Sequence, residues 1–466
     1  MNTKPRGKAG GAEMRHCPPE SGRPRSDALA LLACLAALAV LTGCAVKEGG
    51  LYADEGQPGI RTAQWPPIGR RVGPAEAAPL PESPSVEDYV AYAALGNPGL
   101  QAAFNRWKAA LERVPQAEAL AHPRFTYRYF IREVETRVGP QEQGFALAQT
   151  LPWFGKLALR GGRAWEAAEA ARMRYEMEKL RLFYQVKDAY YEYYHLGRAI
   201  AVVGEQFAFV KYIEEVLRAR YRAAASQHAD VIRAQVELGK LDDRLRALKD
   251  LQQPVVARLN AALNRPLDAP LPWPTEIAQK AADATDEEIL AWLPVTSPEL
   301  REFEHRIARE EYGIRLARKG YYPDVTVGLG YIDTGSSVMA TRDSSKDPVV
   351  ATVSVNLPVW FRKLEAGVRE AEALKRAAVS ARRERANSLG SRVKMVLYKF
   401  RDAERKINLY RDTLIPKGKQ SLNASQTAFR AGTASFLDLV DAIRMLLEFE
   451  LAYEGARVER AQRLAE

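Results

Sequence analysis

The chain contains few cysteines and histidines, and their positions exclude several kinds of site. Its three cysteines, Cys17, Cys34 and Cys44, all lie in the first 44 residues. A structural disulfide or a cysteine-ligated metal ion in the folded body is therefore excluded. The five histidines show no spacing typical of metal ligands, so we predict neither a metal site nor a cofactor. The sequence also has neither a nucleophile and base pattern nor a phosphate-binding glycine loop, and we expect no enzymatic activity.

Long apolar runs are also scarce. The longest covers residues 28–41, follows several arginines and ends in Leu-Thr-Gly-Cys44. It is too short for a membrane-spanning helix but has the pattern of a secretory signal peptide. The small residues before Cys44 resemble a bacterial lipobox, in which Cys44 becomes the lipidated first residue of the mature chain. An ordinary signal peptide followed by a chance cysteine is the alternative.

The charge balance is basic, with 68 Lys and Arg against 58 Asp and Glu. Removal of residues 1–43 would leave a net charge of about +7, spread over long amphipathic segments of an exported protein. Such a distribution does not form a nucleic-acid binding surface, so we predict no nucleic-acid partner.

What the chain does contain is an internal repeat with a period of about 200 residues. Residues 97–100 (Asn-Pro-Gly-Leu) return as 297–300 (Ser-Pro-Glu-Leu), and residues 221–223 (Tyr-Arg-Ala) return as 429–431 (Phe-Arg-Ala). We therefore divide the chain into a signal peptide, an extended lipid-anchored linker rich in Gly and Pro, a first repeat and a second repeat. Their bounds are residues 1–43, 44–85, 86–290 and 291–466.

Apolar residues spaced three and four apart predict long amphipathic helices, packed as antiparallel coiled coils. The predicted helices cover residues 98–121, 158–222, 226–264, 298–320, 361–415 and 433–464. The second would be about 98 Å long at 1.5 Å per residue, which exceeds the size of a compact domain. Pro416 predicts a kink or break. The Tyr190 to Tyr194 cluster predicts helix packing rather than a substrate site.

Four segments of about nine residues instead alternate apolar and polar side chains and predict strands. They cover residues 124–132, 143–151, 324–332 and 349–357. Nine to eleven tilted residues suffice to cross a bilayer as a β-strand. Soluble hairpins with one buried face are the alternative.

Four strands cannot close a barrel, and an open sheet edge has no hydrogen-bond partners in lipid. Three chains would together supply twelve strands, which is enough for a closed barrel. In such a homotrimer the predicted lipid-facing residues are Phe125, Tyr127, Tyr129, Val325, Val327, Val353 and Val355. The residues expected to face a wet lumen are Arg128, Arg132, Thr352, Ser354 and Asn356.

The duplicated order of helix, strand pair and long helix resembles the TolC-like outer-membrane efflux proteins. The resemblance includes Leu-Pro-Trp-Phe-Gly-Lys-Leu at residues 151–157, Phe-Arg-Ala-Gly-Thr at 429–433 and Asp-Leu-Val-Asp at 438–441. It implies a mainly α fold with a small β part: a helical α-barrel continued by a twelve-stranded outer-membrane barrel in the trimer. It also implies two partners, a periplasmic adaptor (membrane fusion) protein and an inner-membrane pump.

By the same resemblance, Asp438, Asp441 and Asp230 match acidic residues that ring the periplasmic aperture in the family. Rings of carboxylates favour cations. The alternative for Asp438 and Asp441 is a purely structural one, as acids near the start of a helix that Thr433 caps. Ala434 and Phe429 replace an Arg and a Tyr that lock the closed state in other members.

The helix tips around residues 222–226 and 430–434 match the places where the family meets its adaptor, and ordinary exposed turns are the alternative. We therefore predict adaptor contacts at Arg222, Ala224, Arg430, Gly432 and Thr433. Ala224 stands where the second tip has Gly432, and alanine is the poorer residue if the turn requires a positive φ.

These inferences favour the exit duct of a tripartite efflux system, which exports small molecules or metal ions. The duct would be lipid-anchored and would span the outer membrane, with a long periplasmic portion. The alternative is a lipid-anchored periplasmic coiled-coil scaffold or adaptor without a pore.

Overall fold

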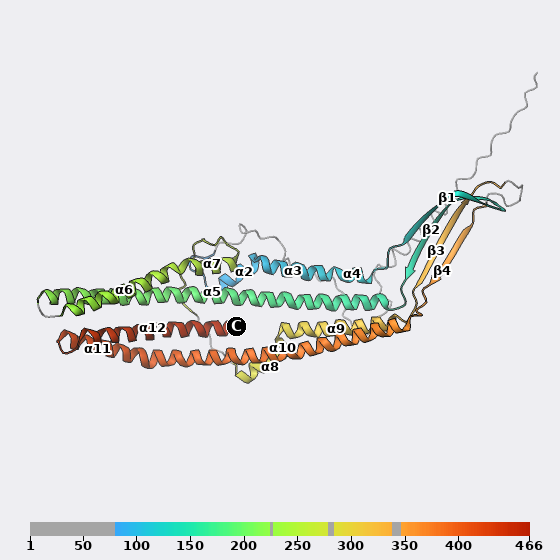
Figure 1. Cartoon of the computed structure of the whole chain (residues 1–466). Coiled ribbons are helices and arrows are strands. Elements are labelled where there is room, and N and C mark those ends of the chain that lie inside the picture. Colours follow the sequence, from blue (N-terminus) through green and yellow to red (C-terminus); the bar gives the residue numbers. More distant parts are fainter. Residues whose placement is uncertain (1–79, 224–226, 278–283, 338–345) are drawn as a thin grey trace, which may run out of the picture. The chain divides into compact units, whose positions relative to one another are not determined.

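The computed structural model describes residues 80–223, 227–277, 284–337 and 346–466. The chain divides into two units, Met1–Arg70 and Arg71–Glu466, and all described residues belong to the second. Two elongated groups of helices and one sheet make up this unit (Figure 1). Cys44, the signal peptide and most of the predicted linker lie outside the described residues.

The described elements follow one another in an order that repeats. The helices are α2 (Val86–Gly96), α3 (Pro98–Leu111), α4 (Arg113–Glu118), α5 (Lys156–Arg222), α6 (His228–Asp250), α7 (Gln252–Leu263), α8 (Asp286–Thr296), α9 (Pro298–Lys319), α10 (Phe361–Leu409), α11 (Ile415–Arg430) and α12 (Phe436–Ala465), with a π-helical turn, η1 (Tyr410–Leu414), between α10 and α11. The strands are β1 (Arg124–Thr136), β2 (Gly139–Leu151), β3 (Val325–Thr334) and β4 (Val349–Val355).

The two copies begin in the same way because they carry the same local signals. Ser85 and Thr285 each form a capping box with the acid three residues later, which starts α2 and α8. Pro98 and Pro298 then open α3 and α9 at the first helical position, where a missing N–H costs nothing. The helices α2 and α8 themselves were not predicted from the sequence.

Most predicted helices are confirmed, with three differences. The segment 98–121 is two helices, which meet at Glu112. The segment 226–264 is divided at Leu251, so Pro254 falls in the first turn of α7, where it removes no intrahelical donor. The last helix begins at Phe436 rather than at residue 433.

Pro416 does coincide with a helix irregularity, as predicted. It lacks an N–H group, and its ring would collide with the carbonyl of Asp412 in a regular helix. The chain makes the π-turn η1 over residues 410–414 and continues as α11, with Pro416 in its first turn. A one-turn π-bulge thus replaces a sharp break.

The four predicted strands form one antiparallel sheet in the order β1-β2-β3-β4. β1 and β2 extend beyond the predicted segments, to residue 136 and back to residue 139. The central pairing joins β2 of the first repeat to β3 of the second, so the sheet is built across the repeat boundary.

The buried apolar residues form two clusters along α5. One cluster packs α5 against α2 and α7, where Tyr89, Tyr193 and Leu259 have almost no exposed surface. Tyr193 stacks on Trp273 and donates a hydrogen bond to the Leu271 carbonyl (3.0 Å). The tyrosine cluster is therefore helix packing, as predicted. The second cluster joins α5, α6, α11 and α12 near the tips.

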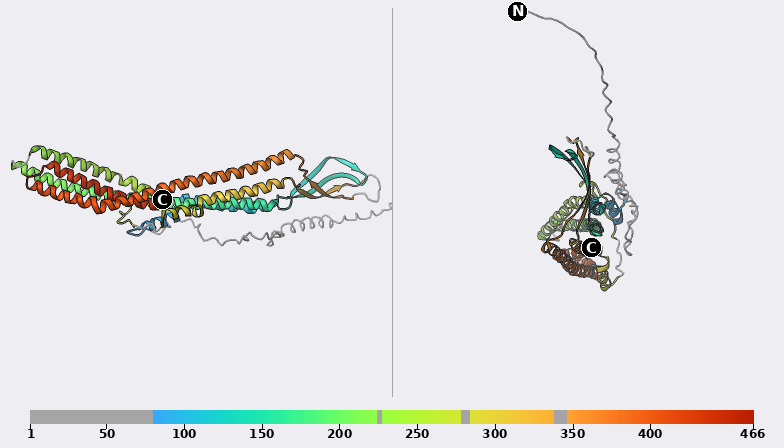
Figure 2. Two further views of the ribbon diagram at one scale, coloured as in Figure 1. Left: turned by 90° about the horizontal axis from the view of Figure 1, so that it is seen from below. Right: turned by 90° about the vertical axis from the view of Figure 1, so that its right-hand side faces the viewer.

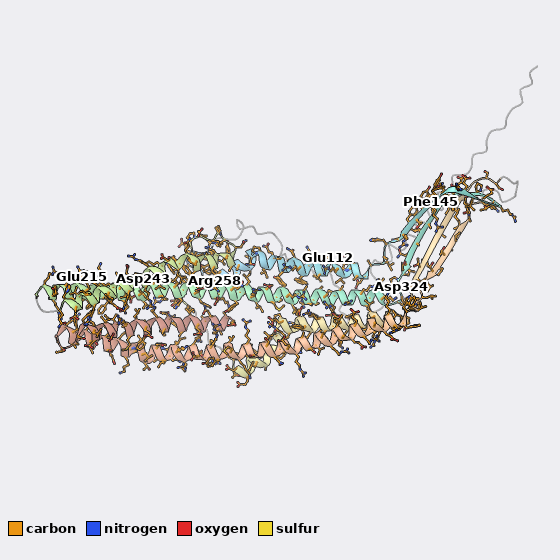
Figure 3. All side chains as sticks on the ribbon, in the orientation of Figure 1. Glu112, Phe145, Glu215, Asp243, Arg258 and Asp324 are labelled. Carbon is orange, nitrogen blue, oxygen red and sulfur yellow. The ribbon has the colours of Figure 1, made fainter. Side chains whose placement is uncertain are left out.

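An ion pair joins the two repeats where the sheet meets the helices. Lys156, in the first turn of α5, is 7% exposed, and its Nζ lies 2.7 Å from an Asp324 carboxylate oxygen and 2.9 Å from the Tyr322 carbonyl. The same carboxylate accepts the Trp153 N–H (2.9 Å). Asp324 thus ties the exit of β2 to the entrance of β3, at the position labelled in Figure 3.

We predict that Lys156→Met lowers the free energy of unfolding by about 3 kcal/mol, because Asp324 and the Tyr322 carbonyl lose a partly buried cationic partner. Thermal unfolding of the detergent-solubilised protein measures the effect. Lys211→Met is the matched control, since Lys211 is an exposed lysine of the same helix, remote from Asp324. Equal shifts in the two variants would contradict the structural role of Lys156.

Candidate functional site

The two faces of the sheet differ in chemistry. Residues paired directly across antiparallel strands share a face, and the register aligns Phe125, Leu147 and Leu329, as well as Tyr127, Phe145 and Tyr331. The rings of Tyr127 and Phe145 lie 5.3 Å apart, and Phe145 is labelled in Figure 3. The face is apolar, yet Phe125 is 66% exposed and Val353 is 70% exposed.

All seven residues predicted to face lipid lie on this apolar face by the strand register. The structure thus brings them together. That lipid covers them stays a prediction.

The opposite face carries mainly small and polar side chains, together with Phe130, Ile332 and Val350. A cavity of about 430 Å³ lies against it, and its lining includes Thr126, Arg128, Gly328, Thr352 and Ser354. Arg128, Thr352 and Ser354 are three of the five side chains expected to face water, whereas Arg132 and Asn356 are not part of this lining. The alternation read from the sequence therefore places polar and apolar groups on opposite surfaces.

The two helix tips lie together at the end of the helices remote from the sheet (Figure 1 and Figure 2). Arg222 is exposed at the end of α5, and Ala224 lies outside the described residues. Arg430 is exposed at the end of α11. The tips from the two repeats contact each other through Arg220, which donates to the carbonyls of Phe429 (3.0 Å) and Arg430 (3.1 Å).

Gly432 ends α11 in a Schellman motif. Its φ is +77°, its N–H donates to the Phe429 carbonyl (3.1 Å), and the Thr433 N–H donates to the Ala428 carbonyl (2.9 Å). The Thr433 hydroxyl also donates to the Ala428 carbonyl (3.1 Å). The glycine is needed because the left-handed conformation disfavours a Cβ atom.

The expected capping role of Thr433 is wrong, because Thr433 completes α11 and Ser435 caps α12. The Ser435 side chain accepts the Asp438 N–H (3.2 Å), and Asp438 accepts the Ser435 N–H (3.0 Å) and hydroxyl (2.8 Å). These hydrogen bonds hold the pKa of Asp438 below its usual value. Ser-x-x-Asp at residues 435–438 is a capping-box signal that the sequence already contained.

The three predicted aperture acids lie near helix starts at the tips. Asp438 and Asp441 are exposed, while Leu439 and Val440 between them are buried. Asp230 occupies the third position of α6, as Asp438 does in α12, and lies 3.4 Å from Arg233. Within one chain, the structure thus presents Asp438 and Asp441 on one exposed helix face.

A second ion pair connects α6 to α12 behind this acidic face. Arg444 contacts the buried Glu237 through two hydrogen bonds, one of them 3.0 Å from Nε to Oε1, and its Nη1 lies 3.7 Å from Asp441. Hydrogen bonding to Arg444 lowers the pKa of Glu237 despite partial burial. Arg444 therefore holds Asp441 and the first repeat together.

Sequence reasoning missed Arg220, Glu237 and Arg444. No local signal could have paired them, because their partners lie more than 200 residues away in the chain. The replaced position Phe429 is buried against Phe436, with ring centroids 6.3 Å apart, and lies beneath the Arg220 guanidinium.

Within the described part of the chain, no group of three or more His, Cys, Asp or Glu side chains could share a metal ion. None of the helices in this part is both long and apolar enough to cross a bilayer.

Comparison with known proteins gives one family match and several structural neighbours. Residues 294–466 match the family model of outer membrane efflux proteins. A curated relative, the cobalt-zinc-cadmium resistance protein CzcC of Cupriavidus metallidurans, is 26% identical over 152 residues. This match covers 32% of the present chain and 33% of the relative, so the chain aligns with about a third of that protein's length.

Solved outer-membrane proteins share the fold over most of the chain. CusC, described as forming a transmembrane channel, has a TM-score of 0.70 at 14% identity, covering 82% of this chain and 90% of that chain. VceC of Vibrio cholerae has a TM-score of 0.68 at 17% identity, covering 82% and 94%. The resemblance stated from the sequence is thus confirmed in its second half by the family match and in its fold by these structures.

We predict that Gly432→Ala destabilises the second tip by about 1 kcal/mol, because alanine disfavours a φ of +77°. No atom lies within 4 Å of the added Cβ, so the cost is confined to the backbone. Gly390→Ala is the control: it adds a Cβ in equally open space inside α10 and should stabilise slightly. Thermal unfolding that shows the same sign for both variants would contradict the assignment.

The lowered pKa of Glu237 predicts a pH-dependent contact between α6 and α12. The contribution of this contact to stability is complete above the usual carboxyl pKa, about 4.3, and is lost as the pH falls through the lowered pKa of Glu237. Spin labels at Ile232 and Met445, both exposed, should move apart on acidification. Glu237→Gln should give the separated distance already at pH 7, whereas the exposed Glu215→Gln control should not. A pH-independent distance in the unsubstituted protein would refute this role.

Proposed function

We propose that this chain, whose residues 294–466 match the family model of outer membrane efflux proteins, is one subunit of the outer-membrane exit duct of a tripartite efflux system. The observation that carries the proposal is the sheet with one apolar, exposed face and one polar face. A soluble hairpin would bury its apolar face against helices. This apolar face has no such cover among the described residues.

The free edges of the sheet support a trimer. In the described sheet, β1 and β4 each pair with one neighbour only. In lipid their unpaired backbone groups would require partners from other chains, and three chains supply twelve strands for a closed barrel. The helices follow the same plan: α3 and α4 pack on α5, α5 also packs on α9, and α9 packs in turn on α10. The helices would thus continue the barrel as a periplasmic α-barrel.

The exposed acids at the tips support an aperture. Three chains would place six carboxylates, from Asp438 and Asp441, around one axis, with Asp230 from the first repeat nearby. Such a ring favours cations. Arg220 and Arg444 would hold the two tips of each chain together, so opening requires these contacts to yield.

Partners and anchoring complete the proposal. The tip residues Arg222, Arg430, Gly432 and Thr433, together with Ala224 outside the described residues, would meet a periplasmic adaptor coupled to an inner-membrane pump. Lipidated Cys44 would anchor the chain in the outer membrane. The cargo would be small molecules or metal ions, and the name of the relative CzcC supports the metal ions.

The test is the state and conductance of the purified protein. A duct predicts a detergent-stable trimer from outer membranes that conducts ions in planar bilayers. The scaffold alternative predicts a non-conducting protein that is a water-soluble monomer once its lipid is removed. The second outcome would refute the proposal.

For the aperture, we predict that Asp438→Ala with Asp441→Ala lowers cation selectivity, because the proposed ring loses the carboxylates that attract cations. The double variant should also ease opening, because α12 loses its capping carboxylate and Arg444 loses its contact with Asp441. Selectivity is measured from reversal potentials in a salt gradient. Replacement of Asp242 and Asp243 by Ala removes the same charge from α6 and should leave selectivity unchanged. Unaltered selectivity in the tip variant would exclude the aperture role.

A further inference from the structure

A basic cavity lies where the sheet joins the helices, apart from the surfaces discussed above. It has a volume of about 770 Å³ and lies between the start of α5, at Ala158 and Leu159, and the end of α9, at Arg315, Arg318 and Lys319. Tyr321 and Tyr322 complete its wall. Three cationic side chains therefore converge on one space within about one helical turn.

Two of these cations lack an acidic partner among the described residues. Arg318 lies 3.4 Å from Glu372. The Arg315 guanidinium instead lies over the Tyr312 ring at 4.2 Å, and the Lys319 ammonium lies over the Tyr322 ring at 5.0 Å. Aromatic faces orient a cation without neutralising its charge, so the cavity retains a net positive charge.

Helix geometry separates the cavity from the flank of α5 that carries Lys156. Lys156 contacts Asp324, whose alternate neighbours along the strand, Thr326 and Gly328, line the polar face. The residues at the start of α5 that line the cavity, Gly155, Ala158 and Leu159, are centred about 100° around the helix from Lys156. The cavity therefore lies on a different flank of α5 from the one that contacts Asp324.

Exposed apolar side chains also lie where the strands meet the helices. Phe154 is 77% exposed, Leu357 73% and Trp360 75%, all at the exits of the strands. Aromatic residues at such positions are typical of the boundary between a bilayer and water. A ligand of this site would thus combine a negative charge with acyl chains.

We infer that the cavity binds the phosphate of an anionic phospholipid, with Arg315 and Lys319 as its charged contacts and the acyl chains against the strand exits. The inference rests on the proposed membrane position of the sheet. Guanidinium and ammonium groups both form charge-assisted hydrogen bonds with phosphate oxygens. The same chemistry would suit free inorganic phosphate, which the experiment separates from lipid.

Delipidated full-length protein in detergent is titrated with short-chain phosphatidylglycerol, phosphatidylcholine of the same chain length, and inorganic phosphate, with bound ligand counted by native mass spectrometry. We expect preferential binding of phosphatidylglycerol. Arg315→Gln with Lys319→Gln should weaken this binding by roughly tenfold or more, since each basic group near an anionic lipid contributes roughly a fivefold factor in affinity. Arg376→Gln with Arg383→Gln, exposed positions on α10, is the charge-matched control.

Ala158→Glu is a second variant that keeps both cations, places a carboxylate at the cavity mouth and should also weaken binding. Equal binding of the two lipids, unchanged binding in both cavity variants, or phosphate binding as strong as lipid binding would each overturn the inference. Conductance recorded on the same samples separates the two proposals. A conducting trimer without phosphatidylglycerol preference overturns the lipid site alone, whereas a non-conducting monomer overturns the proposed duct.

Discussion

The requirement that every strand edge finds a hydrogen-bond partner governs the rest of this structure. Four antiparallel strands leave β1 and β4 each with one open edge in the described sheet, and one face of that sheet is apolar. The open edges are unstable in lipid, whereas the exposed apolar face is unfavourable in water. A barrel closed by other copies of the chain in a bilayer would meet both needs, and the long helices that continue the strands must then follow the same symmetry.

Much of this arrangement could be predicted from the sequence because it depends on local patterns. Strand alternation assigned the two faces of the sheet, and the paired prolines, Pro98 and Pro298, located two helix starts. Where the sequence reasoning erred, at Thr433, a better local signal was present three residues before Asp438. Local rules therefore explain most of the fold and part of the tips.

The remaining features could not be predicted, because they join residues that only the fold brings together. Arg220 meets the end of α11, and Arg444 meets Glu237, across more than 200 residues. Short helices such as α8, which buries none of its residues, carry too weak an apolar pattern to be identified from periodicity. The repeat predicted that the tips correspond to one another. It did not predict which side chains join them.

The π-turn at residues 410–414 also separates two helix segments that pack on different neighbours. A π-turn takes up one more residue than a regular turn, so the helix after it is out of phase by about 100° with the helix before it. The side of α10 that meets α9 and the side of α11 that meets α12 are thereby set independently. A single heptad assignment carried through Pro416 would therefore assign the wrong residues to the helix interface either before or after the π-turn.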